Sequence, residues 1–231
     1  MKTKIVNLAL LLVSIFGTLA ILSAFPDQVP VHFNIHGVAD RFGSKYEFLI
    51  IPLIMLIMDG LWLACDFGYR RQIRSTQDEK KIAEGKTNLK VISITFTLIS
   101  ILFLVLNAVF LYMSYTQLDG ADAPKPDIMS ITTVAMGIVF ILLGNIMPKA
   151  KNNSLIGFRF PWTRYNDVTW VKCNRFAGWT MVISGVITAV GGLIFNGMNA
   201  MLLMMFAIFG SLIVMLIYAY LVYSDEKKKE G

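Results

Sequence analysis

Residues 91–115 read VISITFTLISILFLVLNAVFLYMSY, a run that contains no charged side chain. A helix of about 20 apolar residues crosses the hydrocarbon core of a bilayer. In hydrocarbon only a helix satisfies its own backbone groups, and this run is too long for a barrel strand. The stretch therefore predicts a transmembrane helix.

The same pattern recurs on both sides of this run. The chain of 231 residues is 56% hydrophobic, with a mean hydropathy of +0.63, and soluble domains average roughly 45–50% apolar residues. Long apolar runs alternate with short charged segments, as in a membrane bundle. We predict an all-α membrane protein, a six-transmembrane helical bundle with spans at Ile5–Ala24, Phe48–Cys65, Val91–Tyr115, Ile128–Met147, Ala177–Phe195 and Ala200–Tyr223.

Basic residues predict the orientation of the bundle. Of the 21 lysines and arginines, only Arg41, Lys45 and Lys125 fall on one side of the predicted membrane. Cytoplasmic segments carry an excess of these residues, so we expect both ends of the chain in the cytoplasm. The net charge of +6 is explained by this orientation, and we do not expect direct binding of nucleic acid.

The first run has a second interpretation, as a cleaved signal peptide with Lys2 and Lys4 before its apolar core. Its apolar stretch of about 20 residues exceeds the 7–15 that are usual for a signal peptide, which favours an uncleaved helix. The two cysteines, Cys65 and Cys173, lie at or near the predicted cytoplasmic side. We therefore expect no structural disulfide, and their spacing to histidine does not fit a metal site.

We divide the chain into four segments. Residues 1–67 hold the first two helices and an external loop, 68–127 a cytoplasmic linker and the third helix, 128–224 the last three helices, and 225–231 a basic tail. The charged connection 66–90 is expected to extend a helix into the cytoplasm, although it can also bind anionic lipid or a protein. Three helices in each half can form the inverted repeat typical of transporters, although residue similarity between the halves is weak.

The external loop after the first helix is the first candidate site. Residues 31–36 alternate apolar and polar side chains, which predicts a short strand, and Gly37 allows a turn. His32, Asn34 and His36 then project the same way, and Asp27 or Asp40 comes near if the loop folds back. One interpretation is a pocket for a ligand or metal; the other is a hydrated cap. Two loosely spaced histidines are a weak signal for a metal site, so we predict no metal or cofactor. The candidate ligand-binding residues are Asp27, His32, Asn34, His36, Asp40 and Lys45.

The connection after the fourth helix is the second candidate site. Thr163, Asn166 or Asp167 can cap a short helix that carries Trp170. The loop is either an interfacial segment whose tryptophans suit the membrane boundary or a docking surface for a cytoplasmic protein. Its arginines would face lipid phosphates or an acidic partner. The candidate residues are Asn145, Pro148, Lys149, Asn153, Gly157, Arg159, Pro161, Trp162, Thr163, Trp170 and Arg175.

Asp59 is an acid near the middle of the second predicted span. A carboxylate in hydrocarbon is costly and usually faces a partner or water. It can serve an ion or proton relay, or it can be protonated or bonded to Asn107 or a backbone carbonyl. We keep an ion-coupled transporter as one alternative function and a metal-dependent membrane hydrolase as another. Neither a Ser/His/Asp order, a phosphate-binding glycine loop nor paired catalytic carboxylates stand out, so we do not predict an enzyme.

Two strings of residues resemble one family. The Gly-Asn, Met-Pro-Lys, Gly-Phe-Arg and Pro-Trp-Thr clusters of 144–163, followed by Trp170, Arg175 and Gly178, resemble the signature of the SdpI family. The loop 26–45 is similar to a small extracytoplasmic domain of unknown function often found at the start of that family. The chain departs from the family at Phe158 and Phe160, where Ile and Thr are frequent, and at Cys173-Asn174, where Thr-His is frequent.

The resemblance implies a bacterial plasma-membrane protein, multi-pass, that confers immunity to a secreted peptide toxin. It also implies a receptor that draws a transcriptional repressor to the membrane. Under this interpretation the external loop from His32 to Lys45 meets the peptide, and the cytoplasmic loops meet the repressor. Such signalling needs a toxin that binds two conformations unequally.

Overall fold

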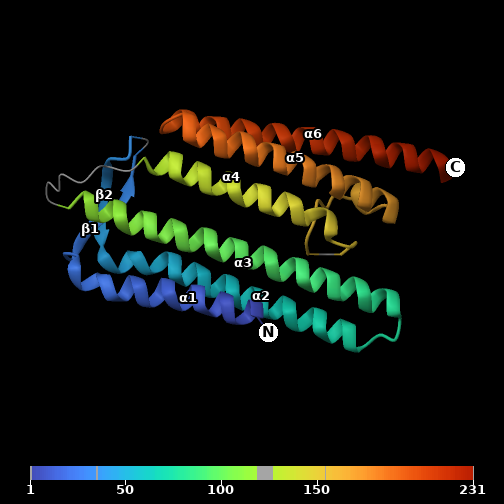
Figure 1. The fold of residues 1–231 in the computed structure, drawn as a ribbon, viewed down its shortest axis with the longest axis horizontal. Helices are drawn as coiled ribbons and strands as arrows, with labels where there is room; N and C mark the ends of the chain where they lie inside the picture. The colour runs from blue at the N-terminus through green and yellow to red at the C-terminus, as the bar shows by residue number, and fades with distance from the viewer. Residues whose placement is uncertain (1, 35, 119–126, 154, 231) are drawn as a thin grey trace.

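The structure is a computed structural model that describes residues 2–34, 36–118, 127–153 and 155–230. The described chain forms six long helices, each antiparallel to the one before it, and all are long and apolar enough to cross a membrane (Figure 1). The six-helix, all-α prediction is therefore confirmed, while the cytoplasmic orientation stays a prediction. The helices are α1 (Lys2–Ile21), α2 (Ile50–Arg74), α3 (Glu79–Thr116), α4 (Ile128–Ile146), α5 (Asp167–Ile194) and α6 (Met198–Glu230).

Helices α2, α3, α5 and α6 continue well beyond their predicted apolar runs. The connection between α2 and α3 is short because α2 ends at Arg74 and the Asp78 carboxylate caps α3, accepting from Lys80 N at 2.9 Å. The Asn166–Thr169 capping box starts α5. The predicted separate short helix around Trp170 is wrong, because this cap opens a helix that runs unbroken into the span.

The backbones of α4 and α5 are in direct contact. A Cβ added to Gly137 would lie 2.5 Å from Ala189 N, and one on Gly178 would lie 2.6 Å from Gly144 O. Helices in a bilayer have little hydrophobic drive to associate, so small residues that permit close approach hold them by van der Waals contact. The α4–α5 pair has the most extensive contact of any two described elements.

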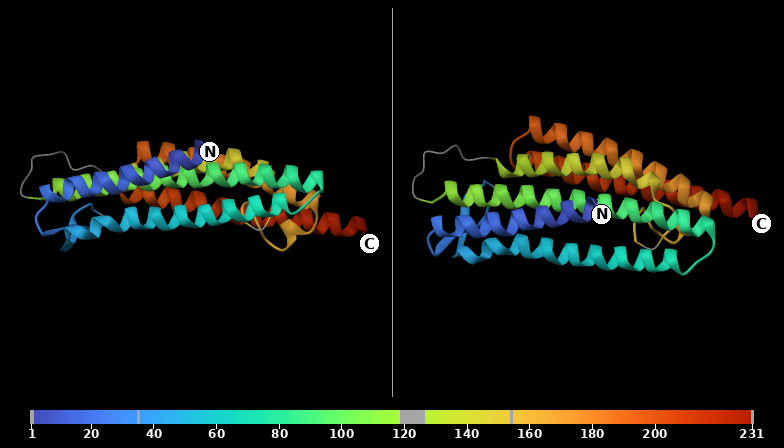
Figure 2. Two further views of the ribbon diagram at one scale, coloured as in Figure 1. Left: turned by 90° about the horizontal axis from the view of Figure 1, so that it is seen from below. Right: turned by 60° about the horizontal axis from the view of Figure 1, so that its bottom comes forward.

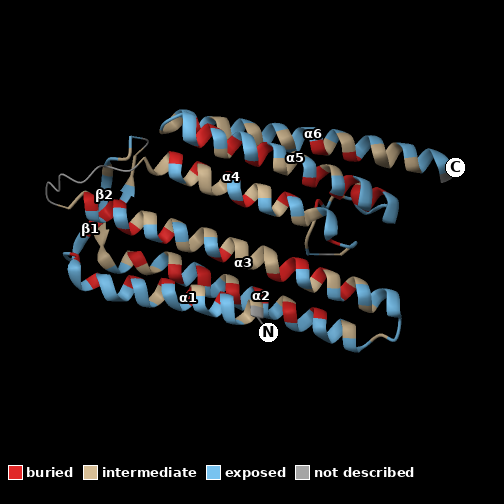
Figure 3. Cartoon of the chain, in the orientation of Figure 1, coloured by how far each residue is buried: buried red, intermediate tan, exposed pale blue. Residues whose placement is uncertain are grey.

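The α1–α3 half is held instead by buried polar side chains. Thr97 Oγ1 donates to Asn7 Oδ1 at 2.6 Å, and Asn107 Nδ2 donates to Ser14 and Thr18. Figure 3 shows buried residues on the facing sides of the helices and exposed ones on their outer sides. Hydrogen bonds of this kind add modestly to helix association in membranes, roughly 0.6–2 kcal/mol each.

The connections nearest the start of α4 are described only in part. Residues 119–126, including Lys125 and most of the predicted exposed turn 116–127, lie outside the described residues. The predicted tight turn at 196–199 is confirmed, and Asp127 Oδ2 accepts from its Gly197 N at 2.6 Å. Burial raises the pKa of Asp127, but hydrogen bonds from Ser130 and Gly197 outweigh it and hold the pKa below the ordinary 3.8. A charged carboxylate thus ties α4 to the α5–α6 turn.

We predict that Gly185→Ala destabilises the protein by about 1–3 kcal/mol, the usual cost of overpacking. Its Cβ would lie 2.7 Å from Gly137 O, which belongs to a backbone that cannot rotate away. Thermal unfolding of the detergent-purified chain measures the effect. The control is Gly210→Ala on α6, whose Cβ would meet no described atom within 4 Å. Equal melting temperatures for the two variants would contradict backbone contact between α4 and α5.

Candidate functional site

Two irregular segments lie at opposite ends of the bundle (Figure 2). At one end, β1 (Gln28–Phe33) and β2 (Ala39–Ser44) form an antiparallel hairpin. At the other end, residues 147–166 connect α4 to α5 through two short 3-10 turns, Met147–Lys149 and Trp162–Arg164. We call these segments the hairpin and the α4–α5 loop.

The base of the hairpin is packed into the bundle. Val29, Val31 and Phe48 are buried together with Leu22, Phe25 and Leu111. The Phe48 ring meets Phe25 and Phe110 edge-on, with centroids 5.0 and 5.6 Å apart. Edge-to-face rings are a favoured geometry for buried aromatic pairs. The hairpin therefore has a defined seat on α3 and on the 3-10 turns Leu22–Ala24 and Lys45–Leu49, which follow α1 and precede α2.

Two polar side chains at the end of α3 fix the hairpin backbone. Ser114 Oγ donates to Pro30 O at 2.8 Å. The Gln117 amide spans the turn, donating to Gly37 O at 2.6 Å and accepting from Ala39 N at 2.7 Å. Gly37 has φ +70°, in the left-handed region that favours glycine. The turn is therefore attached to the bundle and does not hang free.

His32 and Asp40 face each other across the two strands. His32 Nδ1 lies 2.6 Å from Asp40 Oδ1, and the side chains are 64% and 42% exposed. Beside them Arg41 pairs with Glu47 at 2.9 Å. The structure thus brings His32 to Asp40, as the folding back of the loop predicts. The hairpin exposes the ionisable side chains of His32, Asp40 and Arg41, which a charged or polar ligand can contact.

The other predicted ligand-binding residues of the hairpin make different contacts. β1 ends at Phe33, earlier than the alternation of residues 31–36 predicts, and Ile35 lies outside the described residues. Asn34 Oδ1 accepts from His36 N and Val38 N and so closes the turn. Asp27 pairs with Lys45 at 3.0 Å at the opposite end of the strands. Within the described residues, no three His, Cys, Asp or Glu side chains come together as a metal site.

The α4–α5 loop is built around Trp170. Its Nε1 donates to Ala150 O at 2.8 Å, and both residues are buried. Gly157, with φ +118°, passes against the Trp170 ring, and Asn174 Oδ1 accepts from Phe158 N at 2.7 Å. Asn174 is one of the positions at which the chain departs from the family pattern, and here its amide fills a structural role.

Other motif residues satisfy the backbone of the loop. Asn153 Oδ1 accepts from Leu155 N and Ile156 N, both at 2.7 Å. The Thr163 hydroxyl, fully buried, donates to Phe158 O at 2.9 Å. Across the bundle, Lys151 N donates to Asn88 Oδ1 of α3 at 2.8 Å. Trp162 stacks on Phe160 and contacts Tyr220 of α6 edge-on. Much of the signature therefore shapes the loop.

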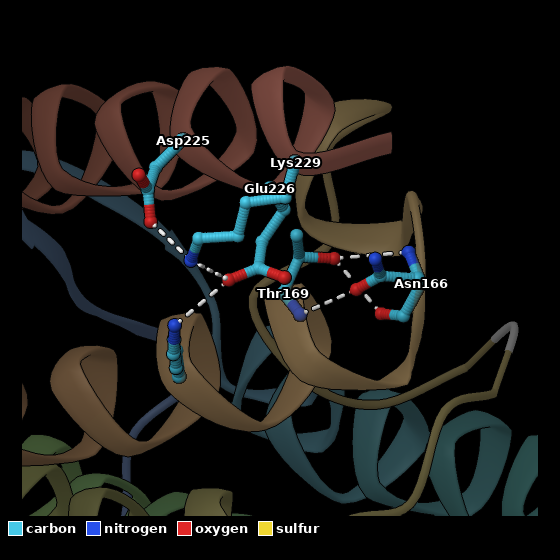
Figure 4. A network of polar contacts seen from close by, with 6 residues as sticks. Asn166, Thr169, Asp225, Glu226 and Lys229 are labelled. Atoms are coloured by element: carbon cyan, nitrogen blue, oxygen red, sulfur yellow. Dashed lines mark hydrogen bonds and ion pairs between the residues drawn. The ribbon is translucent and has the colours of Figure 1, made fainter. Parts of the chain in front are cut away.

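The remaining motif residues lie on its surface. Asn145 Nδ2 donates to Ile141 O of its own helix, and Pro148 packs against Gly178. Pro161 and four basic side chains are exposed: Lys149, Arg159, Arg164 and Arg175. Nearby, Lys172 pairs with Glu226, which also meets Lys229 beside the capping box of α5 (Figure 4). The loop therefore presents positive charge at the end where α6 finishes.

Asp59 faces the interior of the α1–α3 half. It is 8% exposed, and its Oδ1 has no hydrogen-bond partner among the described residues. Asn107, one of the partners considered for it, donates to Ser14 and Thr18 instead. An intramembrane acid without a described partner is a functional candidate.

The fold defines the class, a multi-pass membrane protein with an ordered segment at each end of its bundle. Residues 149–219 match the SdpI/YfhL protein family, and residues 9–56 match a domain of unknown function (DUF1648). The chain is 27% identical over its whole length, and over 99% of the relative, to Immunity protein SdpI of Bacillus subtilis (strain 168). These matches confirm the resemblance to the SdpI family and a bacterial, multi-pass membrane protein. No solved structure matches the chain.

Sequence reasoning missed the residues that attach the two segments to α3. Asn88, Ser114 and Gln117 lie in or just after a helix, 63 to 84 residues along the chain from the groups they bind. The one sequence signal for such a residue is a polar side chain within an apolar run. This signal does not identify the group that the side chain binds.

We predict that Gly157→Ala loosens the α4–α5 loop. Its Cβ would lie 2.7 Å from Asn174 Oδ1, and its φ disfavours any L side chain, a cost of about 1–3 kcal/mol. Limited trypsin digestion should cut the loop faster at its basic residues. Gly68→Ala on α2, where a Cβ would meet no described atom within 4 Å, is the control. Unchanged cleavage in Gly157→Ala would contradict the described packing.

Proposed function

We propose that this chain is a membrane immunity protein that protects its bacterium from a secreted peptide toxin. The observation that carries the proposal is its similarity, along the full length of both chains, to Immunity protein SdpI. The similarity spans both ordered segments, since DUF1648 matches residues 9–56 and the SdpI/YfhL family matches residues 149–219.

The hairpin is the segment we assign to toxin recognition. It lies on the side predicted to be external, its base is buried, and its turn is bonded to α3 by Gln117. Binding to a preformed surface avoids the entropy of ordering a loop. The exposed groups of His32, Asp40 and Arg41 supply polar contacts. Asn34 and His36 belong to the turn beside them, and Asp27 and Lys45 form a second polar group at the opposite end of the strands.

The α4–α5 loop is the segment we assign to a cytoplasmic repressor. Its exposed Lys149, Arg159, Arg164 and Arg175 suit an acidic surface, because charge complementarity increases the rate and specificity of association. Its backbone is held by Trp170 and Asn88, so the basic groups project from an ordered frame.

A survival assay tests the proposal. A sensitive bacterium that expresses the chain is challenged with secreted antimicrobial peptides, beside a His32→Ala/Asp40→Ala variant. We expect specific protection from one peptide and a loss of at least about tenfold in the variant, the usual effect of removing a binding hot spot. Exposed ion pairs contribute roughly 0–1 kcal/mol to stability, so the variant should still fold.

The matched control is Asp225→Ala/Lys229→Ala, an exposed pair at 2.7 Å near the other end of the bundle. It should keep full protection at equal membrane expression. Protection that survives His32→Ala/Asp40→Ala would move recognition away from the hairpin. A chain that is well expressed and protects from no peptide would overturn the immunity function itself.

Asp59 supports a second candidate function, an ion-coupled transporter. Its buried carboxyl with an Oδ1 that lacks a described partner is suited to bind a proton or cation within the membrane. In proteoliposomes under an imposed pH gradient, Asp59→Asn should then reduce proton flux at least about tenfold, since the amide cannot titrate. If vesicles that contain the unmodified chain show the same proton flux as protein-free vesicles, the transporter function is contradicted.

A further inference from the structure

The bundle has a step at the end that carries both termini. α1 begins at Lys2, whereas α2 continues beside and past it to Arg74, and Figures 1 and 2 show that α1 starts partway along the bundle. A cavity of about 460 Å³ lies at this step, between the start of α1 and the last turns of α2. Neither the hairpin nor the α4–α5 loop contributes to its walls.

Basic side chains dominate the polar wall of the cavity. They are Lys4 from α1 and Arg70, Arg71 and Arg74 from α2. The one acid among its lining residues is Asp66. Asp66 Oδ2 binds both Lys4 Nζ at 2.6 Å and Arg70 Nε at 2.8 Å. The wall therefore keeps an excess of positive charge after its single carboxylate is counted.

Asp66 positions two of these cations and does not neutralise the wall. Its side chain is 3% exposed, while Lys4 and Arg70 are 41% and 46% exposed. A buried carboxylate must be paired, so Asp66 fixes the positions of both cationic groups. Each group stays partly exposed and can still contact a ligand. Arg71 and Arg74 are exposed and have no ionic partner among the described residues, so their guanidinium groups are available to a ligand.

The part of the cavity wall that lies nearer the middle of α2 is apolar. Leu63 and Phe67 line it, and they are 47% and 69% exposed although both belong to a predicted membrane helix. Side chains of this kind, one turn below a row of arginines, mark the boundary between hydrocarbon and headgroups. A soluble anion would use the cations and leave this wall uncovered, whereas a lipid would use both.

We propose that this cavity is a binding site for the phosphate headgroup of an anionic phospholipid, with its acyl chains against Leu63 and Phe67. Guanidinium groups match the geometry of phosphate oxygens by paired hydrogen bonds. Basic pockets between transmembrane helices are a known form of lipid-headgroup site. The bound lipid bridges α1 and α2 at the step where α1 begins.

Native mass spectrometry of the full chain in a non-ionic detergent tests the site. Phosphatidylglycerol is titrated beside phosphatidylcholine, and glycerol phosphate is added as a soluble competitor. Two basic residues at a membrane surface contribute about 1 kcal/mol each, so Arg71→Gln/Arg74→Gln should weaken phosphatidylglycerol binding about 30-fold. The matched control is Lys86→Gln/Lys90→Gln, which removes two exposed charges from the neighbouring α3 outside the cavity, and it should bind as the unmodified chain does.

Each other outcome overturns the proposal in a different way. If both double variants lose phosphatidylglycerol binding equally, the lipid binds through general surface charge and not in this cavity. Displacement by glycerol phosphate at concentrations similar to those of the lipid would assign the cavity to a soluble anion. Equal binding of phosphatidylcholine would contradict a preference for an anionic headgroup. Thermal unfolding without lipid should be unchanged in Arg71→Gln/Arg74→Gln, which separates lost binding from lost fold.

Discussion

A backbone amide or carbonyl in hydrocarbon needs a partner within the protein, because no water is available to it. The six helices meet this requirement by themselves, so segments of any other shape are confined to the ends of the bundle or need side chains to complete them. At both ends of the bundle, side chains supply the hydrogen bonds that the non-helical segments need. Pro30 O and Gly37 O of the hairpin are paired by Ser114 and Gln117. Ala150 O of the α4–α5 loop is paired by Trp170.

The two halves of the bundle are held in different ways. α4 and α5 touch through glycine backbones, a packing that leaves no room for adjustment. The α1–α3 half contains hydrogen-bonded Asn7 and Asn107, and also Asp59 with an Oδ1 that lacks a described partner. α3 contacts the irregular segments at both ends of the bundle. Ser114 and Gln117 bind the hairpin at one end, and Asn88 binds the α4–α5 loop at the other. A ligand at one segment affects the other only if it binds two arrangements unequally.

The residues that resemble the SdpI family divide into two groups when they are placed in space. Gly144, Gly178 and Gly157 permit close approach of backbone or ring, and Thr163 and Trp170 complete hydrogen bonds of the loop. A second group, Lys149, Arg159, Arg164 and Arg175, is exposed. Part of the motif therefore builds the loop, and its exposed residues are the ones that a partner can contact.

The sequence by itself determined the six spans, the ends of α4 and the two ordered segments, and it left Asp27 and Asp40 open as neighbours of His32. Such features depend on apolar run length and on contacts between residues close in the chain. Only the tertiary structure decided which polar residues complete those segments. Asn88 and Gln117 find their partners far along the chain, Asn107 binds α1 and not Asp59, and Lys4 and Arg70 meet on Asp66. A single residue in an apolar run indicates that a partner is needed, but the packing of the helices selects the partner.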